Sequence, residues 1–95
     1  MRVVLVIITA DPHRSGRALE GLRMSVGLTL ANDRVRVIVA GEAVALLDPE
    51  EESFPRSRRG RELLDALSTQ GAEVVRGEDL AGEVRRAEVI LRWDE

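Results

Sequence analysis

The residues best suited to chemistry lie in one short polar turn between an apolar run and a helix-like stretch. They are Asp11, His13, Arg14, Ser15 and Gly16, and His13 is the only histidine of the chain. Backbone N–H groups at a helix start, assisted by a nearby arginine, favour a phosphate or another small anion. The same residues are also typical of a plain turn, because Asp-Pro initiates turns and Ser15 can cap the helix. The sequence therefore predicts either an anion site or a structural turn at this position.

Catalysis by this turn is a second interpretation. His13 and Arg14 could support acid–base or phosphoryl chemistry in a small enzyme. A nucleophilic triad of Ser15, His13 and Asp11 is not expected, since neighbours in one short turn rarely point at a common centre. Metal binding lacks a ligand spacing pattern, and the single glycine of the turn is no dinucleotide fingerprint. We therefore assign no catalytic residue, no metal and no cofactor.

The composition narrows the function classes further. The chain has no cysteine, which excludes disulfides, a thiolate nucleophile and a thiolate metal site. All fourteen basic residues are arginine, so lysine chemistry such as a Schiff base is excluded as well. A net charge of -3 and a pI near 5.2 argue against nucleic-acid binding, which needs a basic surface.

Membrane insertion and secretion are not expected from the opening segment. The apolar run at 2–8 is too short to span a bilayer. It also lacks the cationic start and the small-residue cleavage site of a secretory signal. We therefore expect a cytoplasmic protein.

The elements that must position the polar turn follow from alternating apolar and amphipathic segments. Apolar residues are 44% and aromatic residues only 2%, which predicts a core of Val, Leu, Ile and Ala. Strands are predicted at 2–8, 35–40, 72–75 and 88–93, and helices at 15–31, 42–47, 57–70 and 79–85. This alternation favours parallel pairing with right-handed crossovers. We predict one small three-layer α/β domain at 1–95, with a mainly parallel sheet of four to five strands and helices on both faces.

The first predicted helix is apolar on two sides. At helical spacing, one stripe comprises Leu19, Leu22, Val26 and Leu30. A second stripe, roughly opposite, comprises Met24, Leu28 and Ala31. One stripe can cover the sheet, and the other must meet a neighbouring helix of the same chain or another subunit. Because a small core gains from added burial, we expect a homo-oligomer.

A charge-segregated segment at 48–61 has acids in its first half and arginines in its second. The arginines are Arg56, Arg58, Arg59 and Arg61. One interpretation is a flap whose arginines meet an anionic ligand or partner. The other is a solvated loop leading into a helix, with local ion pairs of little energetic value.

Topology predicts where a ligand would bind. In open α/β sheets, ligands bind beyond the carboxyl ends of the strands. Here those ends are the polar turn, Gly41 with its neighbour Glu42, and Arg76 with Gly77. We predict one cleft in which Gly41, Arg76 and Gly77 join the polar turn, with the segment 48–61 close enough to cover it. An anion in that cleft would meet helix N–H groups and Arg14.

Three stretches, taken in order, resemble a known family. They are Val4-Leu-Val-Ile-Ile-Thr-Ala-Asp-Pro12 leading into 17–23, then 35–41, then 64–75. This succession resembles the DsrE-like family of sulfur-relay (DsrE/DsrF) and related proteins, over most of the chain. The resemblance implies a small α/β unit with a mainly parallel sheet, which assembles as a dimer, trimer or hexamer.

The resemblance also implies what this chain should not do. Some members carry a sulfur-accepting cysteine just after the third strand, where this chain has Arg76 and Gly77. Neither residue can replace a thiolate, so persulfide transfer is not expected. We expect a non-catalytic, homo-oligomeric member that binds a small anion or a protein partner. The alternatives are an accessory subunit that pairs with a cysteine-bearing relative, or the small enzyme described above.

Overall fold

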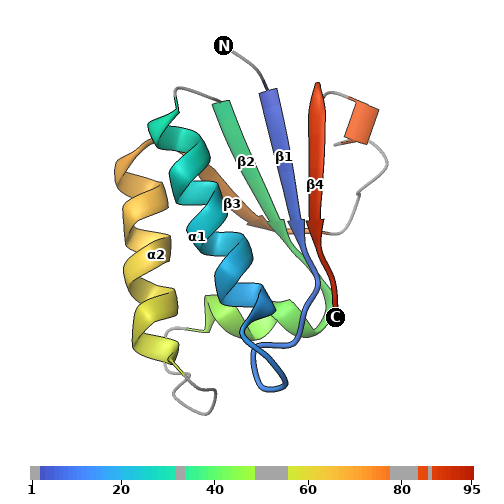
Figure 1. The fold of residues 1–95 in the computed structure, drawn as a ribbon, viewed down its shortest axis with the longest axis vertical. Helices are drawn as coiled ribbons and strands as arrows, with labels where there is room; N and C mark the ends of the chain where they lie inside the picture. Colours follow the sequence, from blue (N-terminus) through green and yellow to red (C-terminus); the bar gives the residue numbers. More distant parts are fainter. Residues whose placement is uncertain (1–2, 32–33, 49–55, 78–83, 86) are drawn as a thin grey trace.

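The computed structural model describes residues 3–31, 34–48, 56–77, 84–85 and 87–95. Its strands are β1 (Val3–Ile8), β2 (Arg34–Val39), β3 (Glu73–Arg76) and β4 (Val89–Trp93). Its helices are α1 (Arg17–Leu30), the 3-10 helix η1 (Gly41–Leu47) and α2 (Ser57–Thr69). The four strands form one parallel sheet in the order β3-β2-β1-β4, with the helices packed against it (Figure 1).

β1 is one of the two inner strands and explains the apolar opening of the sequence. It pairs with β2 from Val3 opposite Arg34 to Ile8 opposite Val39. On its other side it pairs with β4, up to Ile8 opposite Trp93. A parallel strand with neighbours on both sides and cover on both faces needs apolar side chains throughout. Accordingly, five of its six residues are buried.

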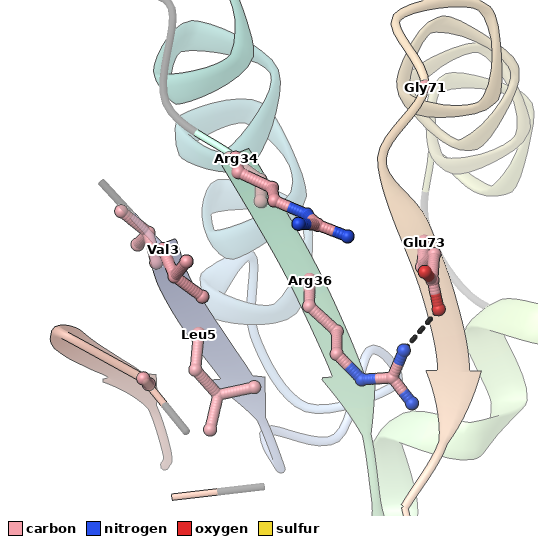
Figure 2. Close-up of a pocket in the computed structure, with 9 residues that line it drawn as sticks. Val3, Leu5, Arg34, Arg36, Gly71 and Glu73 are labelled. Carbon is pink, nitrogen blue, oxygen red and sulfur yellow. Dashed lines mark hydrogen bonds and ion pairs between the residues drawn. The ribbon is translucent and has the colours of Figure 1, made fainter. Parts of the chain in front are cut away.

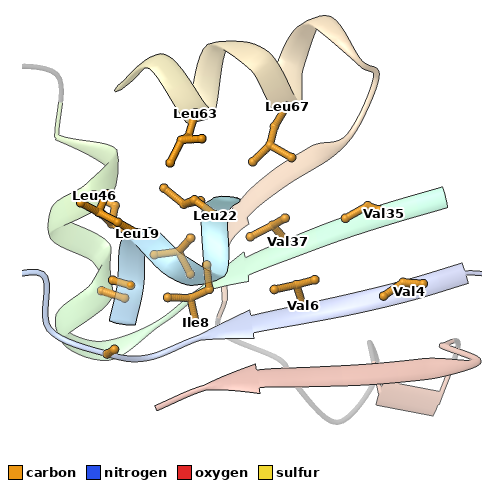
Figure 3. Packing of buried hydrophobic residues seen from close by; sticks show 14 residues of the cluster. Val4, Val6, Ile8, Leu19, Leu22, Val35, Val37, Leu46, Leu63 and Leu67 are labelled. Atoms are coloured by element: carbon orange, nitrogen blue, oxygen red, sulfur yellow. The ribbon is translucent and has the colours of Figure 1, made fainter. Parts of the chain in front are cut away.

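The main core lies between one face of the sheet and the three helices (Figure 3). Its large side chains come from β1, β2, α1, η1 and α2: Val4, Val6, Ile8, Val35, Val37, Val39, Leu19, Leu22, Leu46, Leu63 and Leu67. Each such side chain contributes about 1.5–3 kcal/mol when fully buried. A second, smaller cluster of Leu5, Ile7 and Ile38 lies on the opposite face, with Val75 and Ala87 packed against it.

The predicted α/β class is confirmed, with four strands, all of them parallel. Helices were predicted on both faces, but α1, η1 and α2 all pack on the same face of the sheet. Strand and helix boundaries differ from the predicted ones by one or two residues. Gly71 ends α2 in the left-handed conformation as predicted, with φ of 83°. The helix predicted at 79–85 falls mostly outside the described residues, although Val84 and Arg85 are helical.

Two local predictions for the first helix are wrong. Leu30 was expected in the buried stripe but is 69% exposed, since periodicity gives the direction of a side chain and not the extent of the surface beneath it. Gly16, not Ser15, occupies the N-cap position of α1, and no side-chain cap hydrogen bond forms there. The hydroxyl of Ser15 accepts the N–H of Arg17 at 3.3 Å instead.

Gly21 allows α1 to approach the sheet closely. A Cβ atom at this position would lie 3.0 Å from two side-chain atoms of Ile8 and 3.1 Å from Cγ of Trp93. Ile8 is completely buried and has little room to move. Gly27, in the same helix, has no atom within 4 Å of the corresponding position. The two glycines therefore form a matched pair, one required by packing and one not.

We predict opposite effects of alanine at these two positions. Gly21→Ala should lower the free energy of unfolding by about 1 kcal/mol, because overpacking costs about 1–3 kcal/mol and helix propensity returns up to about 1 kcal/mol. Gly27→Ala should raise it by about 0.5–1 kcal/mol through propensity alone. Urea unfolding at low protein concentration measures both, and an equal gain in the two variants would refute the close packing of α1.

Candidate functional site

The candidate site lies at the edge of the sheet where all four strands end. Helices α1 and α2 both begin at this edge, so their N-terminal N–H groups are gathered there (Figure 1). β4 ends beside β1, and the carbonyl of Trp93 accepts the N–H groups of Thr9 and Ala10 at 3.0 and 3.1 Å. The residues after β4 are thereby placed against the polar turn between β1 and α1.

The first half of the polar turn is organised by Asp11. Its Oδ1 accepts the backbone N–H of His13 at 2.9 Å, and Nδ1 of the His13 ring lies 2.9 Å from the same oxygen. The hydrogen bond from the His13 backbone, then that from its side chain, holds the pKa of Asp11 below its usual value. Arg14 is exposed, and its N–H closes the turn on the carbonyl of Asp11 at 3.0 Å. This half of the turn therefore has the predicted turn chemistry, with an aspartate orienting the histidine.

The second half of the turn is filled by a carboxylate of the chain itself. Oε1 of Glu95 accepts the backbone N–H of Asp11 at 2.7 Å. The hydroxyl of Ser15 lies 3.3 and 3.2 Å from the two carboxylate oxygens of Glu95. An N–H group and a hydroxyl are the donors expected of an anion site. In this structure they hold the Glu95 side chain.

Asp94 reinforces the same contact between the end of β4 and the turn. Its side chain accepts a short hydrogen bond from the hydroxyl of Thr9, and its carbonyl accepts Nε of Arg17. Arg92 adds an ion pair at 3.3 Å. The hydroxyl of Thr9, followed by Arg92, holds the pKa of Asp94 below its usual value of 3.8. The turn thus carries three carboxylates, from Asp11, Asp94 and Glu95, which would repel a further anion.

A small cavity opens beside this turn, between the first turns of α1 and α2. Its volume is about 180 Å³. It is lined by Gly16, Leu19, Glu20, Arg23, Arg56, Arg59 and Leu63. Three arginines face one glutamate there, and Gly16 is the member of the predicted site that takes part. Arg59 also pairs with Glu62 at 3.1 Å.

Arg56 holds an unusual backbone conformation at this cavity. With φ of 63° and ψ of 30° it is left-handed, at the N-cap position of α2. A residue with a Cβ atom adopts this conformation at a cost of roughly 1–2 kcal/mol, and glycine would avoid that cost. Strained backbone of this kind is concentrated at functional sites. The conformation sets the start of α2 and places Arg56 in the wall of the cavity.

The remaining predicted site residues lie farther along the same edge. Gly41 begins η1 directly after β2, with a positive φ of 60°. Arg76 is the last residue of β3, and Gly77 donates its N–H to the carbonyl of Val39 at 2.9 Å. β3 is separated from β1 by β2, so Arg76 and Gly77 are about two strand spacings, or roughly 10 Å, from the polar turn, whereas Gly41 follows the strand next to β1. The structure thus places the predicted residues along one edge.

Three residues at this edge were not predicted from the sequence as part of the site: Arg23, Asp94 and Glu95. The signal for Asp94 and Glu95 was present, because residues that follow the last parallel strand reach the same edge as the polar turn. Arg23 lies two helical turns after Gly16, a spacing that puts both on one side of α1. Segment 48–61 was expected near the site, and its described arginines Arg56 and Arg59 do line the cavity, whereas 49–55 lie outside the described residues.

Within the described part of the chain, no group of three or more His, Cys, Asp or Glu side chains is arranged to hold a metal ion. None of the helices seen there has both the length and the apolarity needed to cross a bilayer.

Comparison with known proteins bears on the fold. No protein-family model matches the chain, and no curated protein does. The crystal structure of the ychN protein from E. coli matches it with a TM-score of 0.78, over 97% of this chain and 99% of that chain. The chain is similar in fold to ychN. At 18% sequence identity this likeness concerns the fold alone, and it supports the DsrE-like fold that the sequence resemblance implies.

The contact between β4 and the turn predicts a specific pKa change. In Thr9→Val the pKa of Asp94 should rise towards 3.8, because the hydroxyl of Thr9 is the largest cause of its lowering. Carbon-detected NMR titration of the Asp94 carboxyl measures this change. Thr29→Val is the control, since the hydroxyl of Thr29 donates within α1 to Val26.

The same pKa fixes the sign of the pH dependence. A carboxyl whose pKa is lowered by folding stabilises the fold above its unfolded pKa, and that contribution is lost as the pH falls through the folded value. The wild type should therefore lose stability below about pH 4, and Thr9→Val should lose less over the same range. An unchanged Asp94 titration in Thr9→Val would show that the two side chains are not paired.

Proposed function

We propose that this protein is a non-catalytic, DsrE-like binding protein that holds a small anion between the first turns of α1 and α2. The observation that carries this proposal is the arginine-lined cavity at the carboxyl edge of the sheet. Arg23, Arg56 and Arg59 provide three positive charges, against Glu20 in the lining and Glu62, which is paired with Arg59, so one positive charge remains in excess. The N-terminus of α2 adds the positive end of a helix dipole at the same place.

The size of the cavity supports a small ligand. At about 180 Å³ it is smaller than the roughly 300–1,000 Å³ typical of sites for drug-sized molecules. A cavity of this size can hold phosphate, sulfate, or one such group carried by a larger molecule. Arginine binds these tetrahedral anions through paired N–H donors, which favours arginine over a point charge.

The polar turn supports the placement of the anion in this cavity. Its donors hold Glu95, and three carboxylates surround it, so an added anion would have to displace Glu95 against their repulsion. The absence of cysteine agrees with binding without sulfur transfer. An enzyme that uses His13 and Arg14 would need its substrate in the turn, beside the same carboxylates.

Anion binding is tested with a matched pair of arginine variants on α2. Phosphate titrated into isotope-labelled protein should shift the amide signals of the first turns of α1 and α2. Arg59→Gln should weaken phosphate binding about tenfold, because one charge-assisted contact contributes about 1.5–3 kcal/mol before screening by salt. Arg58→Gln removes the same charge one residue away, from an exposed position that does not line the cavity, and should change affinity little.

Two results would contradict the anion site. Equal weakening by the two variants would mean that only the overall charge matters. Phosphate shifts confined to 9–15, and lost in Arg14→Ala, would return the site to the polar turn. Arg56→Gly provides a further check, because it should weaken phosphate binding while it relieves the left-handed strain and raises stability.

We also propose self-association through the exposed C-terminal half of α1. Met24 is 39% exposed, and Ala31, two turns later on the same side of the helix, is exposed as well. Leu30, which is 69% exposed, lies about 120° around the helix from Met24, so the surface extends over a broad side of the helix and not along one stripe. Leu28, in contrast, packs against the main core and does not contribute to this surface. Two copies that meet through these apolar side chains would remove them from water, which supports a dimer or a larger ring.

If the protein self-associates through this surface of α1, a charge introduced there should dissociate the oligomer. Met24→Glu and Leu30→Glu should each reduce the mass measured by light scattering at micromolar concentration, because each would bury an unpaired carboxylate. Gln70→Glu adds the same charge at the exposed C-cap position of α2 and should leave the mass unchanged. A monomeric wild type would refute the proposal. In native mass spectrometry of protein from its own host, a heteromer with a cysteine-bearing relative would indicate an accessory subunit instead.

A further inference from the structure

A second cavity lies far from the edge discussed so far, on the opposite face of the sheet and at the amino ends of the strands (Figure 2). Its volume is about 420 Å³, within the range of small-molecule sites. The residues that matter for its chemistry are Val3, Leu5, Arg34, Arg36, Glu73 and Ala87. Neither the proposed anion site nor the sequence prediction uses any of them.

The cavity lies where charged side chains interrupt the apolar pattern of the sheet. Alternation along β2 places Arg34, Arg36 and Ile38 on one face, and Ile38 is buried there with Leu5 and Ile7. β2 is an inner strand, and such strands in parallel sheets are expected to be apolar on both faces. Two arginines in succession on that face depart from the rule, and such departures are concentrated at functional sites.

The charges within the cavity are not balanced. Arg36 forms an ion pair with Glu73 on the neighbouring strand β3 (Figure 2). Among the described residues, the guanidinium of Arg34 has no hydrogen-bond or ion-pair partner. Among the residues that line the cavity, one positive charge therefore remains, at an exposed position beside the pair. A further carboxylate, that of Glu88, accepts the N–H of Val3 at 3.4 Å on the β4 side of the cavity. A single negative charge on a ligand would complete the set, whereas a second negative charge would be repelled by Glu73.

The other side of the cavity is apolar. Val3 and Leu5 line it from β1, next to the arginines of β2, and Ala87 packs against the same cluster. Leu5 is only 2% exposed and forms a firmly held floor, so the apolar surface that a ligand can cover comes from the partly exposed Val3 and Ala87. An apolar body laid along this wall would gain from burial, while its charged end reached Arg34.

We propose that this cavity binds a monocarboxylate with a short apolar body. The carboxylate pairs with Arg34, and the hydrocarbon lies over Val3, Leu5 and Ala87. Arg36 and Glu73, which are paired with each other, form the polar rim. The site is independent of the anion cavity between α1 and α2, and a failure of either leaves the other standing.

Octanoate is the probe for this site, with octanol and phosphate as chemical controls. In NMR titrations, octanoate should shift amides of Val3, Leu5, Arg36 and Glu73, and octanol should bind more weakly because it lacks the charge. Phosphate should leave these amides unshifted and act at the other cavity. Octanol binding as tight as octanoate, phosphate shifts at these four amides, or no saturable shift at millimolar octanoate would each overturn the proposal.

Variants of the exposed arginine complete the test. Arg34→Gln should weaken octanoate binding about tenfold, and Arg34→Lys should retain part of the affinity since it keeps the charge. Arg76→Gln removes an exposed arginine at the far end of β3 and serves as the control for net charge. Dispersed amide spectra verify that each variant is folded. Equal affinities of wild type and Arg34→Gln would show that Arg34 does not hold the carboxylate.

Discussion

The pairing of β4 with β1 is the constraint on which the rest of the structure depends. It makes β1 an inner strand, which is why the opening of the chain must be apolar. It brings Trp93 against α1 at Gly21, so that helix and sheet are in close contact. It also places Asp94 and Glu95 at the polar turn, where they bind Thr9, Asp11, Ser15 and Arg17. This one strand pairing thus determines how the core packs and which charged groups lie at the edge where the strands end.

The electrostatics at that edge divide it into two parts. Around the polar turn, internal carboxylates satisfy the donors that an outside anion would need. Between the first turns of α1 and α2, arginines outnumber acids, and the left-handed backbone of Arg56 is held at a cost in stability. We therefore propose that the turn has a structural role and that the neighbouring cavity binds the anion. The absence of a thiol agrees with the proposal that the protein binds an anion and does not transfer sulfur.

The fold was predictable from the sequence because its signals are local. Apolar runs, helical spacing and the glycine at position 71 follow from short-range geometry, and alternation of elements implies a parallel sheet. The strand order was not predicted, so Asp94 and Glu95 could not be placed beside Ser15, about eighty residues earlier. The cavity on α1 and α2 was only partly predictable. The arginines of 56–61 were visible as a charged run, but Arg23 joins them through helix packing, which depends on tertiary structure.

Anomalous diffraction tests the central claim, that the anion binds beside the polar turn and not within it. A crystal soaked in selenate and measured at the selenium absorption edge would locate the anion directly. We predict an anomalous peak between the first turns of α1 and α2, within reach of Arg23, Arg56 and Arg59, with the Glu95 carboxylate still bonded to the N–H of Asp11. A peak in the β1–α1 turn with Glu95 displaced would contradict it.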